Sequence, residues 1–233
     1  MYKIIRFTPA SQRYYPKSLN CSSYMKEDDI DHTSVDFALG ASRIGGPIVD
    51  LPESLDYPKN MFFTAQLDLK KFSAFDPLDF LPKTGFLYFF ISNSGEHGKV
   101  LYANVEANQL TRIIREHDGW FYDGCLVNDI FNEKEDFRSR YRYCEAGEDL
   151  DGYDEGDMLW DDHAGSEKSK IYGIYTHCQK HEETIKAITQ EADVLLLQIG
   201  EDFTGEGVWS VQIDLVSLIH RRFHNCRFEW GQT

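Results

Sequence analysis

The sequence predicts an α+β fold that is predominantly β-sheet, and three observations support this. Aromatic residues make up 14% of the chain, and such side chains are favoured in strands. Apolar runs of strand length occupy residues 85–91, 194–199 and 208–213. Hydrophobic residues account for 42% of the composition, as in ordinary globular proteins, so the chain can build a core. We expect the three runs to pair into sheets that share one core.

The N-terminal third is expected to be loop-rich. All seven prolines lie within the first 82 residues. Proline breaks helices and removes a donor from sheet ladders, so the elements here should be short. One helix is predicted at residues 26–39, before Gly40 ends it.

The middle of the chain predicts one hairpin and one insertion. The run at 85–91 is apolar without interruption, so both faces of that strand should be covered. Turn residues at 92–98 and a second apolar run at 100–103 complete a hairpin. Residues 145–162 are densely acidic and repel one another. We therefore expect a single domain over 1–233, with an exposed acidic loop inserted at about 145–165.

The C-terminal part predicts alternating helices and strands. A short helix is expected at 181–191 and another at 215–223, and a last strand at 226–230. Buried strands are expected at 194–199 and 208–213.

A weak internal echo suggests two related β-rich halves packed as one body. A glycine element, a short apolar strand with glutamine and a further strand occur in the same order in both parts of the chain. The competing explanation of the same pattern is chance similarity between short apolar strands. The matching segments are 43–47, 65–68 and the strand from 85 in the first half, and 170–173, 197–199 and the strand at 208–213 in the second.

The composition excludes several classes of function. The formal net charge of −15 repels a phosphate backbone, which argues against nucleic acid as a partner. No long apolar stretch suits a signal peptide or a membrane span, so we expect a soluble, cytoplasmic protein. The five cysteines lack paired spacing and are expected to be free thiols. The acidic surface provides solubility, or it steers the protein toward a basic partner.

Several short segments occur in an order typical of one family. They are 42–47, 51–52, 57–58, 65–69, 81–90, 173–179, 195–199 and 214–215. In this order they resemble the YwqG-like family, whose function is unassigned. The resemblance spans about 40–230 and implies an α+β fold dominated by β-sheet, with no established activity or catalytic residues. The chain departs from the family at Ile174 and Tyr175, where a proline is usual, and at 203–207, where a Trp-Gly-Asp segment is common.

The most site-like cluster combines a glycine pair with polar residues. Gly45 and Gly46 allow a close backbone approach, and Arg43 offers a planar fork to a carboxylate. The structural alternative is a turn in which Arg43 pairs with Asp68 or with the backbone. The ligand-binding candidates are Arg43, Gly45, Gly46, Gln66, Asp68, Gln179 and Gln198.

No metal, cofactor or catalytic constellation is predicted. The histidines and cysteines at 177–181 and at 220–226 lack the paired spacing of a zinc site. The run at 151–162 resembles a calcium loop, but Tyr153 stands where a carboxylate is needed. No nucleophile elbow and no His-Glu-x-x-His segment occurs.

Three functions remain open. The leading hypothesis is a non-catalytic binding protein with a groove between two β-rich halves. One version of it is an immunity or antitoxin-like partner of a basic toxin. The competing hypothesis is a hydrolase or small-molecule-binding protein with a site near Arg43, Gln66 and Asp68. A structural or regulatory interaction domain is the third.

Overall fold

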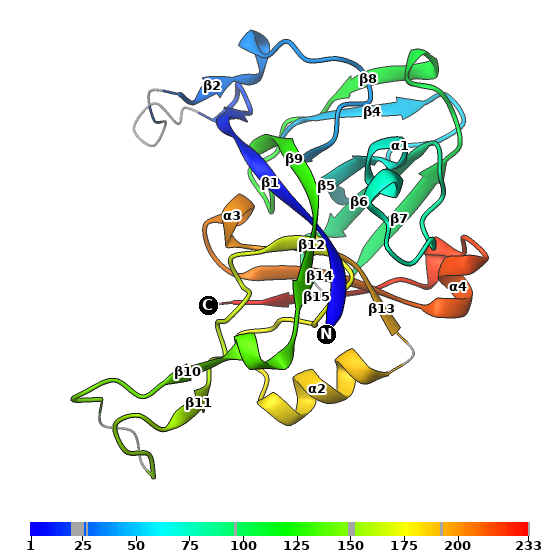
Figure 1. The fold of residues 1–233 in the computed structure, drawn as a ribbon. Helices are drawn as coiled ribbons and strands as arrows, with labels where there is room; N and C mark the ends of the chain where they lie inside the picture. The colour runs from blue at the N-terminus through cyan, green and yellow to red at the C-terminus, as the bar shows by residue number, and fades with distance from the viewer. Residues whose placement is uncertain (20–25, 27, 96, 149–151, 192, 233) are drawn as a thin grey trace.

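One large, mostly antiparallel sheet dominates the fold (Figure 1). The computed structural model describes residues 1–19, 26, 28–95, 97–148, 152–191 and 193–232. Within these residues eleven strands join the sheet, ten of them in one row and β2 (Ile30–Asp31) beside β1. The row runs β15 (Arg227–Gly231), β14 (Val208–Asp214), β13 (Asp193–Ile199), β12 (Ser169–Ile171), β1 (Tyr2–Tyr15), β9 (Gly124–Glu135), β3 (Arg43–Gly45), β5 (Met61–Asp68), β6 (Phe86–Ser92) and β7 (Gly98–Ala103).

The long strands β1 and β9 pair at the centre of this row. The register of β1 shifts on both sides of Pro9, between Phe7 and Arg13. Proline cannot donate to the ladder, so it lies at the irregularity of the strand. The expectation of short elements throughout the N-terminal third is therefore wrong for β1, which has 14 residues.

The helix predicted at 26–39 does not form in the described part of that segment. Instead β2 is followed by the 3₁₀ helix η1 (His32–Ser34). The Asp31 side chain accepts a hydrogen bond from the backbone N–H of Thr33 at 2.8 Å. Local bonding of this kind competes with a continuous helix, which explains why the short turn forms instead.

The three apolar runs form β6, β13 and β14 as predicted, and they contribute to one core. Leu87 and Phe89 of β6 lie in the same buried cluster as Leu197 of β13 and Trp209 of β14. The rings of Phe89 and Trp209 meet edge to face, with centroids 6.5 Å apart. The predicted shared core is confirmed.

The two end strands of the sheet curl toward each other. A Cβ atom placed on Gly98 of β7 would lie 2.5 Å from the Phe228 ring of β15. The ring of Tyr102 on β7 also approaches that of Phe223, which lies in the turn just before β15, with centroids 5.8 Å apart. Side chains therefore bridge β7 and β15, and the sheet is nearly closed.

Two smaller sheets attach to this body. In one, β4 (Ile48–Pro52) pairs with β8 (Leu110–Ile114), and Val49 and Leu51 of β4 pack on the outer side of β5 and β6. In the other, β10 (Tyr141–Tyr143) pairs with β11 (Met158–Trp160). This hairpin projects from the body (Figure 1), and we call residues 141–148 and 152–160 the acidic arm.

The helices are short. α2 (Glu182–Gln190) confirms the helix predicted at 181–191, whereas the one predicted at 215–223 divides into α4 (Leu215–Ile219) and η5 (Phe223–Asn225). None of the described helices is long and apolar enough to cross a membrane. The remaining helical elements are α1 (Leu69–Phe72), η2 (Ser73–Phe75), η3 (Ala107–Gln109), η4 (Phe137–Arg140) and α3 (Glu201–Thr204).

The strands are arranged in a similar way on the two sides of the central β1–β9 pair. On one side of the β1–β9 pair lie β3, β5, β6 and β7, and on the other lie β12, β13, β14 and β15. On each side a short helix, α1 or α3, follows the second of these strands in the chain.

Candidate functional site

The predicted cluster places Arg43 opposite Gln66 on paired strands, and both side chains are fully buried. The Nη2 atom of Arg43 donates to Oε1 of Gln66 at 3.0 Å and lies 3.0 Å from Oδ2 of Asp50. Its Nε donates to the carbonyl of Ile48 at 3.0 Å, and its Nη1 to that of Ala41 at 2.8 Å. Each nitrogen of the guanidinium group is therefore engaged by the protein itself.

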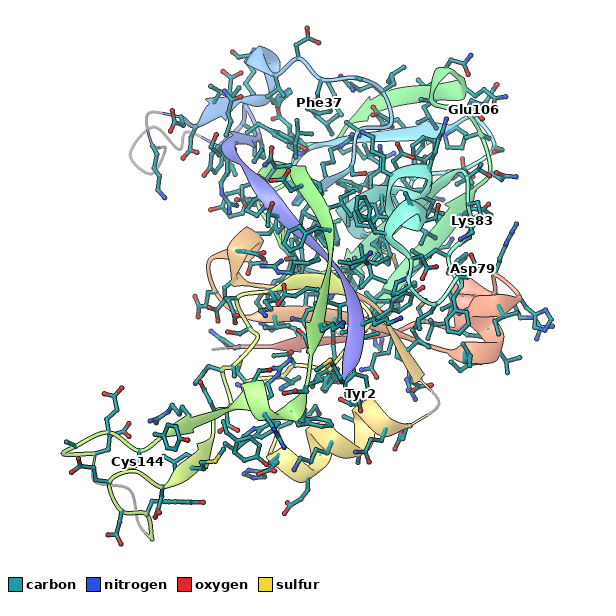
Figure 2. All side chains as sticks on the ribbon, viewed as in Figure 1. Tyr2, Phe37, Asp79, Lys83, Glu106 and Cys144 are labelled. Carbon is teal, nitrogen blue, oxygen red and sulfur yellow. The ribbon has the colours of Figure 1, made fainter. Side chains whose placement is uncertain are left out.

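Asp50 is the acidic centre of this network. Its carboxylate accepts from the backbone N–H of Gly40 at 2.9 Å and from Nε of Arg112 at 2.9 Å. Burial alone raises the pKa of Asp50, but the hydrogen bond from Arg112 and the charge of Arg43 outweigh it, so the pKa is lowered. Phe37, labelled in Figure 2, covers the network: the guanidinium carbons of Arg43 and Arg112 lie 5.0 and 4.5 Å from its ring centroid.

Of the two structural partners expected for Arg43, the backbone is observed, at the carbonyls of Ile48 and Ala41, and Asp68 is not. The Asp68 carboxylate accepts from the backbone N–H of Lys70 at 3.1 Å and caps the start of α1.

The remaining polar candidates lie on the other side of the β1–β9 pair. Gln198 is fully buried opposite Lys170, and its Nε2 donates to the carbonyls of Gly165 at 3.0 Å and Lys168 at 2.7 Å. Gln179 is exposed in the segment after β12. The structure thus brings Arg43 and Gln66 together and places Gln198 and Gln179 in a different region.

The glycine pair supports a neighbouring loop. Gly45 and Gly46 have φ values of 65° and 84°, a region that glycine adopts readily. The N–H of Gly46 donates to the carbonyl of Phe121 at 2.9 Å. A Cβ atom on Gly45 would lie 2.1 Å from the carbonyl oxygen of Asp123. The pair therefore lets β3 approach residues 118–123, which we call the pocket loop.

A cavity of about 540 Å³ opens beside the pocket loop. Four of its lining residues are aromatic and three are acidic. The lining as a whole comes from four separate parts of the chain. We call it the aromatic–acidic pocket. Its lining comprises Asn93, the pocket loop (118–123), Thr204, Glu206, Trp230 and Gln232.

Aromatic rings meet at steep angles in this pocket. The centroids of Trp120 and Trp230 are 4.7 Å apart with planes at 61°, and those of Phe121 and Trp230 are 6.3 Å apart with planes at 87°. The indole N–H of Trp120 donates to the carbonyl of Asn93 at 3.0 Å. Phe121 has φ 57°, a conformation that is costly for a bulky residue. Packing of its ring against Trp209, with centroids 5.6 Å apart, helps to hold it there.

The carboxylates of the pocket differ in how far they are neutralised. Asp123 accepts from Nη1 of Arg13 at 2.6 Å, and burial raises its pKa although Arg13 opposes this. Among the described residues, the hydrogen-bond donor to Glu206 is a neutral one, Nε2 of Gln232 at 3.1 Å. Asp118 is exposed and makes no hydrogen bond or ion pair within the described residues. The pocket therefore keeps a surplus of negative charge.

Among the described residues, potential metal ligands and cysteines do not form a second candidate site. In the part of the chain that the structure describes, no three or more His, Cys, Asp or Glu side chains gather in a way that would hold a metal ion. Cys125, Cys144, Cys178 and Cys226 are free thiols, whereas Cys21 lies outside the described residues.

A sequence model for a domain of unknown function, DUF1963, matches residues 42–231. The chain belongs to this family. The matched region of the DUF1963 chain begins one residue before β3 and ends on the last residue of β15. It includes Arg43, Asp50 and Gln66, and all of the pocket lining except Gln232. No curated protein matches the sequence.

The pocket of this DUF1963 chain was not predicted from the sequence. A local signal existed, because residues 118–123 read Asp-Gly-Trp-Phe-Tyr-Asp, with a carboxylate at each end of an aromatic run. Trp230 and Glu206 join that run only through the curvature of the sheet. Residue spacing alone does not reveal such a meeting.

Proposed function

We propose that this DUF1963 protein is a cytoplasmic, non-catalytic binding protein whose aromatic–acidic pocket receives a positively charged group from a basic protein partner. The observation that carries the proposal is the lining of the pocket, where aromatic rings and carboxylates surround one cavity. Aromatic faces attract cations, and carboxylates strengthen that attraction. The net charge of −15 favours the encounter with a basic partner over any distance that salt does not screen.

The position of the pocket agrees with a groove between two halves. The pocket loop leads into β9, whereas Glu206 and Trp230 belong to the part of the chain that forms β13, β14 and β15. A partner that fills the pocket would contact both parts at once. An immunity or antitoxin-like role toward a basic toxin is the specific version of this proposal.

We also propose that the fold is YwqG-like and consists of two related halves within one domain, 1–233, with the acidic insertion at about 145–165. The mirrored strand order supports this. So does a repeated contact: Oγ of Ser42 accepts from the N–H of Asp68 at 2.9 Å, and Oγ of Ser169 accepts from the N–H of Gly200 at 2.9 Å. Independent short strands have no reason to share this bond.

The alternative, a hydrolase or small-molecule site near Arg43, Gln66 and Asp68, has weaker support. Arg43 and Gln66 have no exposed surface. The guanidinium group is bonded to Asp50, Gln66 and backbone carbonyls, so a ligand would have to displace internal partners.

The test uses a defined cationic probe. A flexible peptide with both arginine and lysine residues separated by glycine and serine is titrated into the wild-type protein and into Asp118→Asn and Trp120→Ala variants. We expect a Kd about tenfold higher for each variant, which corresponds to ~1.4 kcal/mol. Tyr143→Ala on the acidic arm is the matched control, because Tyr143 is a 67% exposed aromatic residue outside the pocket.

The dependence of binding on salt concentration completes the test. Binding should weaken steeply as the salt concentration rises, because exposed charges are screened. Equal affinity of the wild type and both pocket variants for the peptide would show that the pocket is not the site.

A further inference from the structure

We infer that the aromatic–acidic pocket selects the guanidinium group of an arginine side chain over the ammonium group of lysine. This inference rests on the proposed function of the same pocket. It adds the chemical class of the recognised group, which is decided by the polar partners that the pocket offers.

The aromatic part of the pocket offers little to an ammonium group. The single polar atom of the Trp120 side chain already donates to Asn93. The ring surfaces of Trp120, Phe121 and Trp230 provide no hydrogen-bond acceptor. Lysine carries a compact, strongly hydrated charge with three donors, whereas a guanidinium group is planar, more weakly hydrated and stacks on aromatic faces. Desolvation against these rings therefore costs lysine more.

The pocket wall already binds one guanidinium group. Nη1 of Arg13 donates to Oδ2 of Asp123 at 2.6 Å and to the carbonyl of Phe203 at 2.6 Å, and its Nη2 donates to the carbonyl of Asp202 at 3.3 Å. Several acceptors thus surround a planar fork of donors. Asp118, at the other end of the same loop, supplies a carboxylate with no hydrogen bond or ion pair to any described residue.

Elsewhere in the chain, an arginine and a lysine that lie near aromatic rings have different surroundings. The guanidinium carbon of Arg115 lies 4.4 Å from the ring centroid of Tyr57. In the described part of the chain, the ammonium group of Lys186 lies near three rings, and it also bonds the Tyr141 hydroxyl at 3.1 Å and the Glu182 carboxylate. An ammonium group among rings is accompanied here by two oxygen acceptors. The rings of Trp120, Phe121 and Trp230 supply no oxygen acceptor, so an ammonium group packed against these three rings would gain no such pair from them.

The experiment compares three peptides that differ at one residue: acetyl-Gly-Arg-Gly amide, its lysine counterpart and its neutral citrulline counterpart. Each is titrated by NMR into the wild-type protein, Asp118→Asn and Trp230→Ala. We expect the arginine peptide to bind at least about tenfold more tightly than the lysine peptide, and citrulline to bind worst. Asp118→Asn, at an exposed position, tests the pocket even where Trp230→Ala fails to fold.

The outcomes separate this inference from the proposed function. Equal binding of the arginine and lysine peptides, with both weakened by Asp118→Asn, overturns arginine selection and leaves a cation-binding pocket. Binding of the citrulline peptide as tightly as the arginine peptide overturns both.

Discussion

The Nη2 atom of Arg43 lies 3.0 Å from Oδ2 of Asp50, and neither side chain has any exposed surface. Arg43 comes from β3 and Asp50 from β4, so the ion pair ties the large sheet to the small β4–β8 sheet. Gln66 on β5 bonds both: its Oε1 accepts from Nη2 of Arg43 and, at 2.9 Å, from the N–H of Asp50. Burying two charges is costly, and only such complete bonding compensates for it.

We therefore predict that Arg43→Met lowers the free energy of unfolding by about 3–5 kcal/mol, because it leaves the Asp50 carboxylate buried with a weaker set of partners. Urea unfolding followed by circular dichroism measures the loss. The Arg43→Met/Asp50→Leu double variant should lose less than the sum of the two single variants, because the residues share one network. Additive losses would mean that the pair is not coupled.

Acid should destabilise the protein through two buried carboxylates. Burial raises the pKa of Glu135, but the charge and hydrogen bonds of Lys170, 2.7 Å away, outweigh it, so its pKa lies below the ordinary 4.5. The pKa of Asp50 is likewise below 3.8. A folded-state pKa below the unfolded value gives stability that is present above the unfolded pKa and is lost as the pH falls through the folded one. We predict a free energy of unfolding that declines as the pH falls below about 4.5.

Substitution of Asp50 and Glu135 tests whether these two carboxylates cause the loss of stability in acid. Urea titrations of the wild type, Asp50→Asn and Glu135→Gln between pH 7 and pH 3 should show a shallower decline for each variant, since a group that cannot ionise adds nothing to the slope. A variant that keeps the full wild-type slope would show that its carboxylate does not contribute.

The glycine pair of β3 provides a third prediction. Gly45→Ala places a Cβ atom 2.1 Å from the Asp123 carbonyl oxygen, whereas Gly205→Ala meets nothing within 4 Å. Both glycines have positive φ, 65° and 76°, so both variants bear a backbone cost of about 1–2 kcal/mol. Gly45→Ala should lose a further ~1–3 kcal/mol because of the overlap. Chemical denaturation compares the two variants, and equal losses would contradict close support of the pocket loop.

The parts of the fold that sequence predicted well are those with contiguous signals. Residues 85–91, 194–199 and 208–213 are apolar nearly throughout, and such runs form buried strands wherever they lie in the sheet. β1 escaped prediction because Pro9 interrupts it, although the register shift at Pro9 lets the pairing with β9 continue.

The candidate site was predicted only in part, for a different reason. The close backbone approach expected at the glycine pair is observed at Gly45, but it serves the pocket loop. The choice of Asp50 over Asp68 as the partner of Arg43 depends on the placement of β4, which no spacing in the sequence encodes. Trp230 reaches the pocket loop because the sheet curls, and that is a property of the whole molecule.

The acidic arm provides the last prediction. At its base, the ammonium group of Lys186 on α2 lies 5.7 Å from the ring centroid of Tyr141 and 5.9 Å from that of Trp160, and it pairs with Glu182. Lys186→Gln removes the charge that the rings and the carboxylate hold, so the arm should separate from α2 more often. A glutamate-specific protease should then cut the arm severalfold faster. Lys99→Gln, at an exposed lysine on β7, is the control and should leave the rate unchanged, because the described residues of the arm and of β7 share no contact of this kind. Equal rates for Lys186→Gln and the wild type would show that the arm is held by its other contacts, such as the packing of Phe137 on Trp160.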